Sequence, residues 1–275
     1  MDRLFVVNKP IFISSNRYIN SLKREFNTKK IGYSGTLDPF ATGTLIAATG
    51  KYTKLFPYLK KSPKIYLATL WLGAESKSLD IENIESIKSV NKIPLDMLKE
   101  AILSLRGEIE YYPPKFSAKR VNGKRAYDLA RAGEEVELKR IKSTIYDIEL
   151  LNYSHPFIHF RVSVSEGAYI RSIAQILASK LKTVGTLSSL KRVREGEFFF
   201  ENKRALNPLE FLKIPKNIYL GDETKVALGK KLSLKEFKEQ RDGVYFIEFS
   251  EFFSIIEIKK SFVSYRLNLI PKAKM

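Results

Sequence analysis

The sequence predicts an α/β (α+β) protein with a large domain over residues 1–212 and a small β-rich domain over residues 213–275. In the N-terminal part, apolar residues recur in some segments every second position, as in strands, and in others every third or fourth position, as in helices. After Pro208 the composition changes, Pro215 is a plausible linker residue, and residues 244–269 are strand-like. Because 44% of the residues are hydrophobic, the chain can fill a substantial core.

The large domain is predicted to begin with strands and one helix. Residues 4–7 form a short apolar strand, and Ser14 or Ser15 can cap a helix whose apolar positions have helical spacing. Residues 44–49 and 65–72 are predicted as two further strands. One face of the second strand carries Tyr66, Ala68, Leu70 and Leu72.

The rest of the large domain continues this alternation. Pro94 can open a helix that Gly107 closes. Its expected buried stripe consists of Leu95, Leu98, Ile102 and Leu105. Residues 136–151 and 157–165 alternate in polarity and predict a pair of antiparallel strands, and residues 169–181 predict an amphipathic helix.

The chain is strongly basic. Its 48 Lys and Arg against 30 Asp and Glu give a formal net charge of +18, spread from Lys9 to Lys274. This indicates a broad basic face that binds the phosphates of RNA, DNA or anionic lipid. Lipid is the weaker choice, because no apolar run approaches the roughly 18 residues of a membrane-spanning helix. Residues 4–7 are also too short for a signal peptide, so we expect a cytoplasmic protein without a membrane partner.

Residues 112–133 (YPPKFSAKRVNGKRAYDLARAG) start with a diproline and carry six cations, which predicts a basic loop leading into a short helix. The candidate contacts to RNA phosphates are Lys119, Arg120, Lys124 and Arg125. A merely solvated charged loop would have the same composition, so on composition alone the two interpretations are equally good.

The chain has no cysteine, so thiol nucleophiles, disulfides and cysteine-ligated zinc are excluded. Its two histidines, His155 and His159, are expected on one face of a strand. A histidine metal site or a Ser-His-Asp triad is less favoured than a structural role, because no carboxylate cluster lies nearby in the sequence. We therefore expect no metal.

Residues 31–50 contain a single charged side chain, Asp38, although 28% of the whole chain is charged. A carboxylate isolated among small and apolar residues either caps a helix or serves as a reaction centre. The pair Asp38-Pro39 alone fits the cap, because Asp is a good N-cap and Pro is favoured at the next position. Lysines and arginines on both sides attract polyanions, and this favours chemistry on nucleic acid.

The run GYSGTLDPFATG, residues 32–43, resembles the signature of the TruB family of tRNA pseudouridine synthases, whose usual form is Gly-His-Thr-Gly-x-Leu-Asp-Pro-x-Ala-Thr-Gly. Further segments that match the family's motifs follow its order. These are NKP at 8–10, PKIYLATLWLG at 63–73, EGAYIRSIAQILASKL at 166–181 and LKR at 190–192. The resemblance covers roughly residues 3 to 200.

The resemblance implies a pseudouridine synthase fold, in which helices flank a central mixed, largely antiparallel sheet. It implies that residues 213–275 form a reduced PUA-like RNA-binding module. The activity of the stand-alone bacterial members is isomerisation of uridine 55 in the T-arm of tRNA, without a cofactor. We therefore expect tRNA as the partner of a monomer that has no obligate protein partner.

The resemblance also implies a role for each matched residue. Asp38 would attack the target uridine, Arg171 would pair with Asp38, and Tyr66 would stack on the flipped base. Tyr169 and Leu190 would line the nucleoside pocket. Without the family pattern, Tyr66 and Leu190 would be read as core residues and Arg171 as a surface cation.

Three further positions, Lys9, Pro10 and Tyr33, complete the predicted site. Lys9 and Pro10 would support its floor. Tyr33 stands where the family has His and is expected to contact RNA, and Phe12 stands where the Lys-Pro motif usually continues to Gly.

Two other functions stay open from the sequence. The first is a pseudouridine synthase acting on ribosomal RNA, which the pattern around Asp38 disfavours. The second is a mainly non-catalytic tRNA-binding chaperone, which the retained Asp38 disfavours. The sequence also leaves open whether Asp38 attacks the sugar or the base, and which group removes the C5 proton, for which Tyr66 is one candidate.

Overall fold

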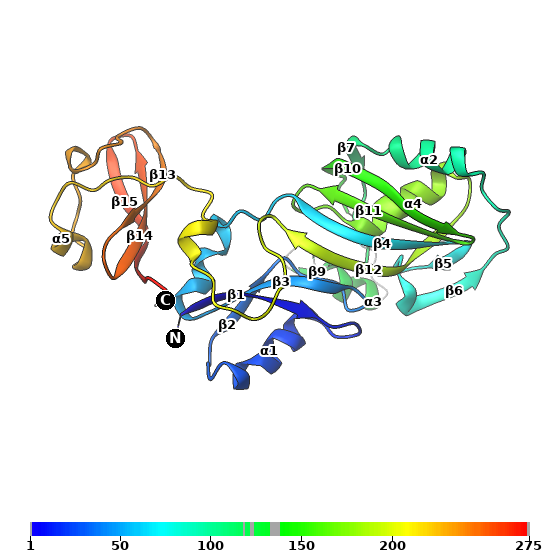
Figure 1. The fold of residues 1–275 in the computed structure, drawn as a ribbon, viewed down its shortest axis with the longest axis horizontal. Coiled ribbons are helices and arrows are strands. Elements are labelled where there is room, and N and C mark those ends of the chain that lie inside the picture. The colour runs from blue at the N-terminus through cyan, green and yellow to red at the C-terminus, as the bar shows by residue number, and fades with distance from the viewer. Residues whose placement is uncertain (1, 118, 122–123, 133–137, 274–275) are drawn as a thin grey trace.

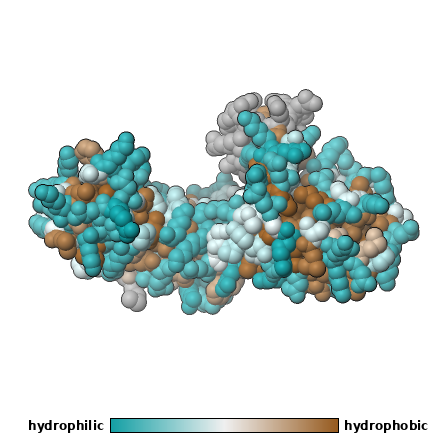
Figure 2. All heavy atoms as spheres, turned by 90° about the horizontal axis from the view of Figure 1, so that it is seen from above, coloured by the Kyte–Doolittle hydropathy of each residue, from teal (hydrophilic) through white to brown (hydrophobic). Residues whose placement is uncertain are grey.

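The structure, a computed structural model, describes residues 2–117, 119–121, 124–132 and 138–273. The molecule is elongated, with a large sheet and its helices at one end and a smaller sheet at the other (Figure 1). Seen from above, hydrophilic side chains cover much of the surface, and apolar areas show among them, the broadest on the end with the large sheet (Figure 2).

Within the described residues, the large sheet has eight strands in the order β1-β3-β12-β4-β11-β10-β7, with β2 paired to β3. These strands are β1 (Arg3–Lys9), β2 (Ile31–Ser34), β3 (Thr42–Thr49), β4 (Lys64–Leu72), β7 (Gly107–Tyr111), β10 (Ile141–Ser154), β11 (Phe157–Val164) and β12 (Gly185–Glu195). Among these described strands, only β3 and β12 pair in parallel. The expected mixed, largely antiparallel sheet is confirmed.

Helices α2 (Leu95–Leu103) and α4 (Ile170–Lys180) bury their apolar stripes in one core with strands β4, β10 and β11. The predicted face of β4, from Tyr66 to Leu72, lies in this core. Helix α1 (Ser15–Glu25) packs on β1 and β3 and begins at Ser14, whose side chain accepts a hydrogen bond from the Arg17 N–H. None of the helices in the described ranges combines the length and the apolar character that crossing a membrane requires.

Shorter elements connect these parts. They are β5 (Ala74–Ser76), β6 (Ile84–Ile87), β8 (Arg120–Val121), β9 (Lys124–Arg125), α3 (Ala126–Arg131), α5 (Glu223–Ala227) and the 3-10 helices η1 (Gly50–Tyr58), η2 (Ile81–Asn83), η3 (Pro208–Phe211) and η4 (Leu234–Glu236). The predicted short helix after the basic loop is α3.

The end of helix α2 differs from the prediction. The helix stops at Leu103 with Ser104 as its C-cap, because the Ser104 N–H bonds to carbonyls of the last turn. Gly107 does not cap the helix but starts β7. Leu105 is buried beyond the helix, and Leu95 is exposed at its first position rather than part of the buried stripe.

The region of β10 and β11 also differs in detail. Strand β10 begins at Ile141, not at residue 136, and residues 136 and 137 lie outside the described part of the chain. The two histidines do not share a strand face. His155 lies in the turn between the strands, because β11 starts only at Phe157, while His159 lies on β11.

In the described C-terminal region, β13 (Gly243–Glu248), β14 (Phe252–Lys259) and β15 (Phe262–Pro271) form an antiparallel sheet. One face of this sheet packs on a small core of its own around Val226 and Phe237. The other face, through Phe253 and Ile255, packs in one core with Leu4 of β1 and residues of β3 and η1. The small sheet is thus joined to the large one by shared apolar packing.

Gly43 allows the parallel pairing of β3 with β12, in which it lies opposite Arg192. Its φ is +107°, and a Cβ at this position would lie 2.2 Å from the Arg192 carbonyl oxygen. Because the contact is with backbone, β12 would have to move to admit a side chain. This glycine fixes the loop of residues 35–41 against the centre of the sheet.

Gly107 gives a matched control for this close approach. Its φ of +109° is nearly the same, but a Cβ there would meet nothing within 4 Å. Both Gly→Ala variants should carry a backbone cost of about 1–3 kcal/mol. Gly43→Ala should lower the free energy of unfolding by about 1–3 kcal/mol more, through overpacking. Denaturant titration measures the difference, and equal losses would contradict the close approach.

Candidate active site

Asp38 lies on the loop between β2 and β3, and buried apolar neighbours hold the loop in place. Leu37 and Phe40 are both buried in the core beside it. The Ser15 hydroxyl oxygen accepts a hydrogen bond from the Leu37 N–H and donates one to the Leu37 carbonyl, both at 2.9 Å. Asp38 itself sits in a turn closed by the Ala41 N–H, so its role is not that of a helix cap, and its side chain is 32% exposed.

Lys9, at the end of β1, is fully buried and contacts this loop through its ammonium group. Its ammonium donates to the carbonyls of Pro10 and Ile13 at 2.8 Å and of Pro39 at 3.1 Å. Burial lowers the pKa of Lys9 to about 8, although the charges of Asp38 and Glu82 oppose the shift. Lys9 therefore joins the turn after β1 to the loop of Asp38.

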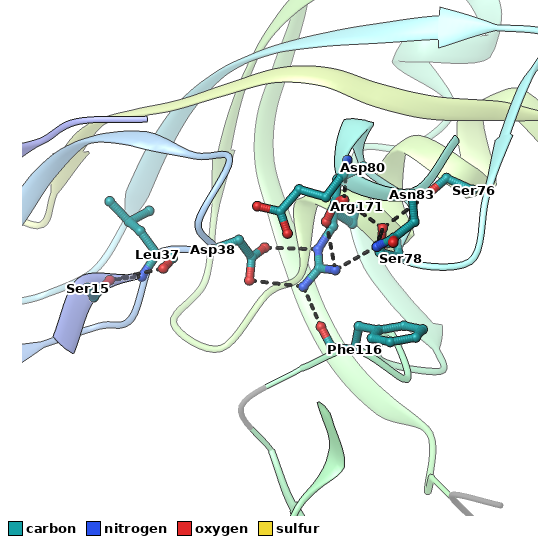
Figure 3. A network of polar contacts seen from close by, with 10 residues as sticks. Ser15, Leu37, Asp38, Ser76, Ser78, Asp80, Asn83, Phe116 and Arg171 are labelled. Atoms are coloured by element: carbon teal, nitrogen blue, oxygen red, sulfur yellow. Dashed lines mark hydrogen bonds and ion pairs between the residues drawn. The ribbon is translucent and has the colours of Figure 1, made fainter. Parts of the chain in front are cut away.

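Arg171, in the first turn of α4, binds the Asp38 carboxylate through two nitrogen atoms. Its Nε lies 2.9 Å from Oδ2 of Asp38, and its Nη2 donates to Oδ1 at 2.9 Å (Figure 3). The other contacts go to Asp80 Oδ2 at 3.2 Å, to the Ser78 carbonyl at 2.6 Å and to the Phe116 carbonyl at 2.8 Å. Arg171 is only 3% exposed, so these five contacts replace water for the five N–H groups of its guanidinium.

Asp80 forms the far side of this cluster, and the sequence analysis missed it. The Ser78 hydroxyl donates to Asp80 Oδ1 at 2.6 Å, and the Glu82 N–H donates to the same atom at 3.1 Å. Burial raises the pKa of the Asp80 carboxyl, while Ser78 and Arg171 favour its charged form. Asp38 thus contacts two nitrogen atoms of the guanidinium, and Asp80 contacts one.

A pocket of ≈ 260 Å³ opens above this ion pair. Its lining residues are Gly35, Thr36, Leu37, Asp38, Lys64, Tyr66, Glu166, Gly167, Ala168, Tyr169, Ile170, Arg171, Leu190 and Arg192. The structure thus brings together Asp38, Tyr66, Tyr169, Arg171 and Leu190 from the predicted set. A larger hollow of ≈ 710 Å³, between the start of α2 and the end of β10, has no carboxylate in its lining and offers no comparable chemistry.

Two of these side chains, Tyr169 and Arg171, lie at the start of α4. Tyr169 precedes the first helical residue, and its N–H donates to the Tyr111 hydroxyl at 2.9 Å. Burial raises the pKa of the Tyr169 phenol, so it stays neutral near pH 7. Tyr66 projects from β4 and Leu190 from β12, which are adjacent strands with Leu190 opposite Ala68.

A second group of buried charges lies beneath the loop. Glu195 is fully buried and pairs with Lys64 at 3.1 Å and with Arg192 at 3.1 Å. Arg192 also donates to the Gly35 carbonyl at 2.6 Å and to the Thr44 carbonyl at 2.8 Å. Both ends of the loop that carries Asp38 are therefore tied to one buried guanidinium.

An ion pair lies at the edge of the pocket. Lys61 approaches Glu166 at 3.0 Å. Burial favours the neutral form of Glu166, but the hydrogen bond from Lys61 and the charges of Lys61, Lys64 and Lys213 together lower its pKa. The edge of the pocket thus combines one carboxylate with several cations.

Other predicted residues lie away from the pocket lining. Tyr33, on β2, is half-buried and packs against the core beneath α1, and Pro10 is exposed. Of the four predicted phosphate contacts, Lys119 is half-buried. The backbones of Arg120, Lys124 and Arg125 lie in β8 and β9, and their side chains are outside what the structure describes. The segment before them reaches the site, since the Phe116 carbonyl contacts Arg171.

The histidines bond to neighbouring hydroxyls. His159 Nδ1 lies 3.0 Å from Thr69 Oγ1, and His155 Nδ1 lies 3.0 Å from the Tyr153 hydroxyl. Among the residues that the structure describes, no three His, Asp or Glu side chains gather in a way that could hold a metal ion.

Comparison with known proteins gives a consistent result. The sequence profile described as TruB family pseudouridylate synthase (N terminal domain) matches residues 23–170. A protein of Sulfurovum sp. (strain NBC37-1) named tRNA pseudouridine synthase B is 60% identical over 272 residues, which are 99% of this chain and 98% of that one. A protein of the same name from Campylobacter concisus (strain 13826) is 52% identical over 99% of this chain and 100% of its own.

A solved structure shares the fold. The crystal structure of a Cbf5-Nop10-Gar1 complex contains a chain that matches with a TM-score of 0.66 and 19% identity, over 98% of this chain and 84% of that one. At this level of identity the likeness concerns the fold alone.

Arg171→Lys should lower the free energy of unfolding by about 2 kcal/mol, because an ammonium has three donors and leaves at least two of the five acceptors without their bond. Arg241→Lys is the matched control. Arg241 grips Glu239 with Nε at 3.0 Å and Nη2 at 2.6 Å, but its side chain is 85% exposed. The control should change stability by less than about 0.5 kcal/mol. Chemical denaturation measures both, and equal effects would contradict the argument from burial.

Lys9 makes stability rise with pH in the alkaline range. Its folded pKa is lowered from 10.5 to about 8, so between these values the unfolded chain binds more protons and the free energy of unfolding increases with pH. Relative to Lys9→Met, which lacks the titrating group, the unmodified chain should gain up to about 2 kcal/mol between pH 8 and pH 9.5. Denaturant titrations at both pH values measure this, and a constant or falling difference would refute it.

Proposed function

This chain belongs to the TruB family of pseudouridylate synthases, and we propose that it isomerises uridine 55 in the T-arm of tRNA to pseudouridine. The relatives at 60% and 52% identity are named tRNA pseudouridine synthase B, which supports tRNA as the substrate. The observation that carries the chemistry is the Asp38 carboxylate, held by a buried guanidinium in a pocket of ≈ 260 Å³.

The reaction suits a site built around one carboxylate. Isomerisation breaks the glycosidic bond from N1, turns the uracil and joins it to the sugar through C5, with no group lost and no change of oxidation state. Asp38 can serve as the nucleophile, either at the sugar carbon or at the base, and hold one fragment while the uracil turns. Such chemistry requires neither a metal nor a cofactor.

Arg171 supports this role electrostatically. A cation that faces Asp38 with two N–H groups balances the charge of the carboxylate and orients it. Because Arg171 is also bonded to Ser78, Asp80 and Phe116, its plane is fixed before substrate arrives. Preorganisation of this kind avoids the cost of reorienting the ion pair during the reaction.

The aromatic and apolar wall of the pocket suits a flipped base. A uridine in a stacked loop must leave its stack to bring its glycosidic bond to a carboxylate. We propose that Tyr66 stacks on the flipped uracil, and that Tyr169 and Leu190 border the nucleoside. Tyr66 is also our candidate for removal of the C5 proton. Lys9 supports the floor through Pro10, Ile13 and Pro39 without facing the pocket.

The substrate would be held mainly through its phosphates. The net charge of +18 supports this, and we propose Lys119, Arg120, Lys124 and Arg125 as backbone contacts, with Tyr33 a further RNA contact outside the pocket. The β-rich residues 213–275 are proposed as a second domain, a reduced PUA-like RNA-binding module. We propose that the protein acts as a cytoplasmic monomer without an obligate protein partner.

Asp38→Asn tests the proposed function. The amide keeps the shape of the carboxylate but is a poor nucleophile, so turnover should fall by at least about 10³-fold while affinity for tRNA changes little. Incubation with an unmodified tRNA transcript, followed by mapping of pseudouridine, measures the product and its position. Asp96→Asn, an exposed residue of α2, is the control and should keep full activity.

The outcomes separate the parts of the proposal. Turnover of Asp38→Asn within tenfold of the unmodified chain would remove Asp38 from the catalytic role. Pseudouridine at another position of the transcript, or only in ribosomal RNA, would overturn the assignment to uridine 55. Loss of binding together with activity would indicate that Asp38 serves mainly to hold the loop.

A further inference from the structure

Phe12 has an unusual combination of conformation and exposure. It lies in the turn after β1, its φ is +61°, and 66% of its surface is exposed. In this left-handed region glycine is unstrained, whereas a side chain with a Cβ is disfavoured. An exposed aromatic ring on such a backbone gains little from the folded core of its own chain.

Hydrogen bonds hold the turn that carries Phe12 against the loop of residues 35–41, which carries Asp38. The Phe12 N–H donates to the Pro39 carbonyl at 2.8 Å. The buried Lys9 ammonium bonds to the carbonyls of Pro10 and Ile13 on this turn and to that same Pro39 carbonyl. Phe12 is therefore bonded to Pro39, the residue that follows Asp38 in the sequence. Strained residues that the surrounding structure holds in this way concentrate at ligand-binding sites.

The proposed reaction and the charge of the chain favour a nucleobase as the partner of the ring. Flipping a uridine out of a loop exposes the faces of neighbouring bases, and an aromatic side chain near the site can cover such a face. The strongly basic chain attracts a polyanion to its surface. The exposed ring adds no charge, so what it contributes is apolar area and a π-face. Phe12 is also where the chain departs from the glycine of the motif that it resembles.

We propose that Phe12 is a stacking site for an unpaired nucleobase of the RNA substrate, adjacent to the target uridine. This inference rests on the proposed function, because it requires an RNA bound over Asp38. It assigns to the turn after β1 a direct contact that is separate from the pocket, since Phe12 is not among the pocket's lining residues. The contact should strengthen binding without taking part in the chemical step.

Substitutions of Phe12 separate strain from stacking, because the two predict different effects. Phe12→Gly relieves the backbone and removes the ring, so the Tm should stay the same or rise by about 2–4 °C, while the Kd for an unmodified T-arm hairpin should rise about tenfold. Phe12→Leu keeps the strain and much of the apolar area, so its Tm should match the unmodified chain while its Kd rises similarly. Phe12→Trp should retain the affinity.

Phe262 offers a matched control far from the site. It is 70% exposed at the start of β15 and follows two residues with positive φ, Lys260 and Ser261. Phe262→Leu should leave the Kd unchanged. The slope of log Kd against log salt should be the same for all these variants, because none of the substitutions changes a charge.

Each result decides between the two claims. An unmodified chain that forms pseudouridine, with a Phe12→Gly variant of equal Kd, overturns the stacking site and leaves the proposed function standing. Full affinity in Phe12→Leu also overturns it, since an aliphatic side chain would then suffice. A tenfold loss in Phe12→Gly with no pseudouridine formed by the unmodified chain supports a nucleobase contact at Phe12 but refutes the proposed function, and with it the place of that contact beside a target uridine. No binding of the hairpin by the unmodified chain refutes both.

Discussion

The guanidinium of Arg171 draws three separate segments of the chain to one buried point. Its partners are Asp38 on the β2–β3 loop, Ser78 and Asp80 after β5, and the Phe116 carbonyl after β7. A buried cation without such partners would be very unfavourable, so the segments must converge for the protein to fold in this form. The same contacts that satisfy the cation orient Asp38, so stability and the geometry of the candidate site depend on one interaction.

The loop that carries Asp38 is held mainly through its backbone carbonyls. Lys9 bonds to three carbonyls, and Arg192 bonds to the carbonyls of Gly35 and Thr44 at the two ends of the loop. Carboxylates lie near these buried cations, with Glu195 paired to Arg192 and the charge of Asp38 near Lys9. A fixed frame of this kind suits electrostatic catalysis, because little has to reorganise when charge develops in the reaction.

What the sequence could predict depended on how local the signal was. The alternation in β4 placed Tyr66 in the core, the Ser14 cap marked the start of α1, and the spacing in α4 identified its buried face. Pairing across the chain left no local trace: Asp80 and Arg171 are separated by 91 positions, and Arg192 by 157 from Gly35. The pairing of Arg171 with Asp38 was expected only through the family resemblance. The predicted end of α2 was wrong because two residues that can close a helix, Ser104 and Gly107, lie close together in the sequence.

The turn after β1 illustrates how a conformational cost can be tolerated. A left-handed backbone is unfavourable for Phe12, but Lys9 holds Pro10 and Ile13 on either side of it, and the Pro39 carbonyl accepts from its own N–H. Because the same ammonium also bonds to the Pro39 carbonyl on the loop of Asp38, a shift of the turn would alter the support of Asp38. A base bound at the turn would therefore be coupled to the orientation of the carboxylate through one lysine. An RNA that contacts Phe12 would therefore find the Asp38 carboxylate already oriented by Arg171.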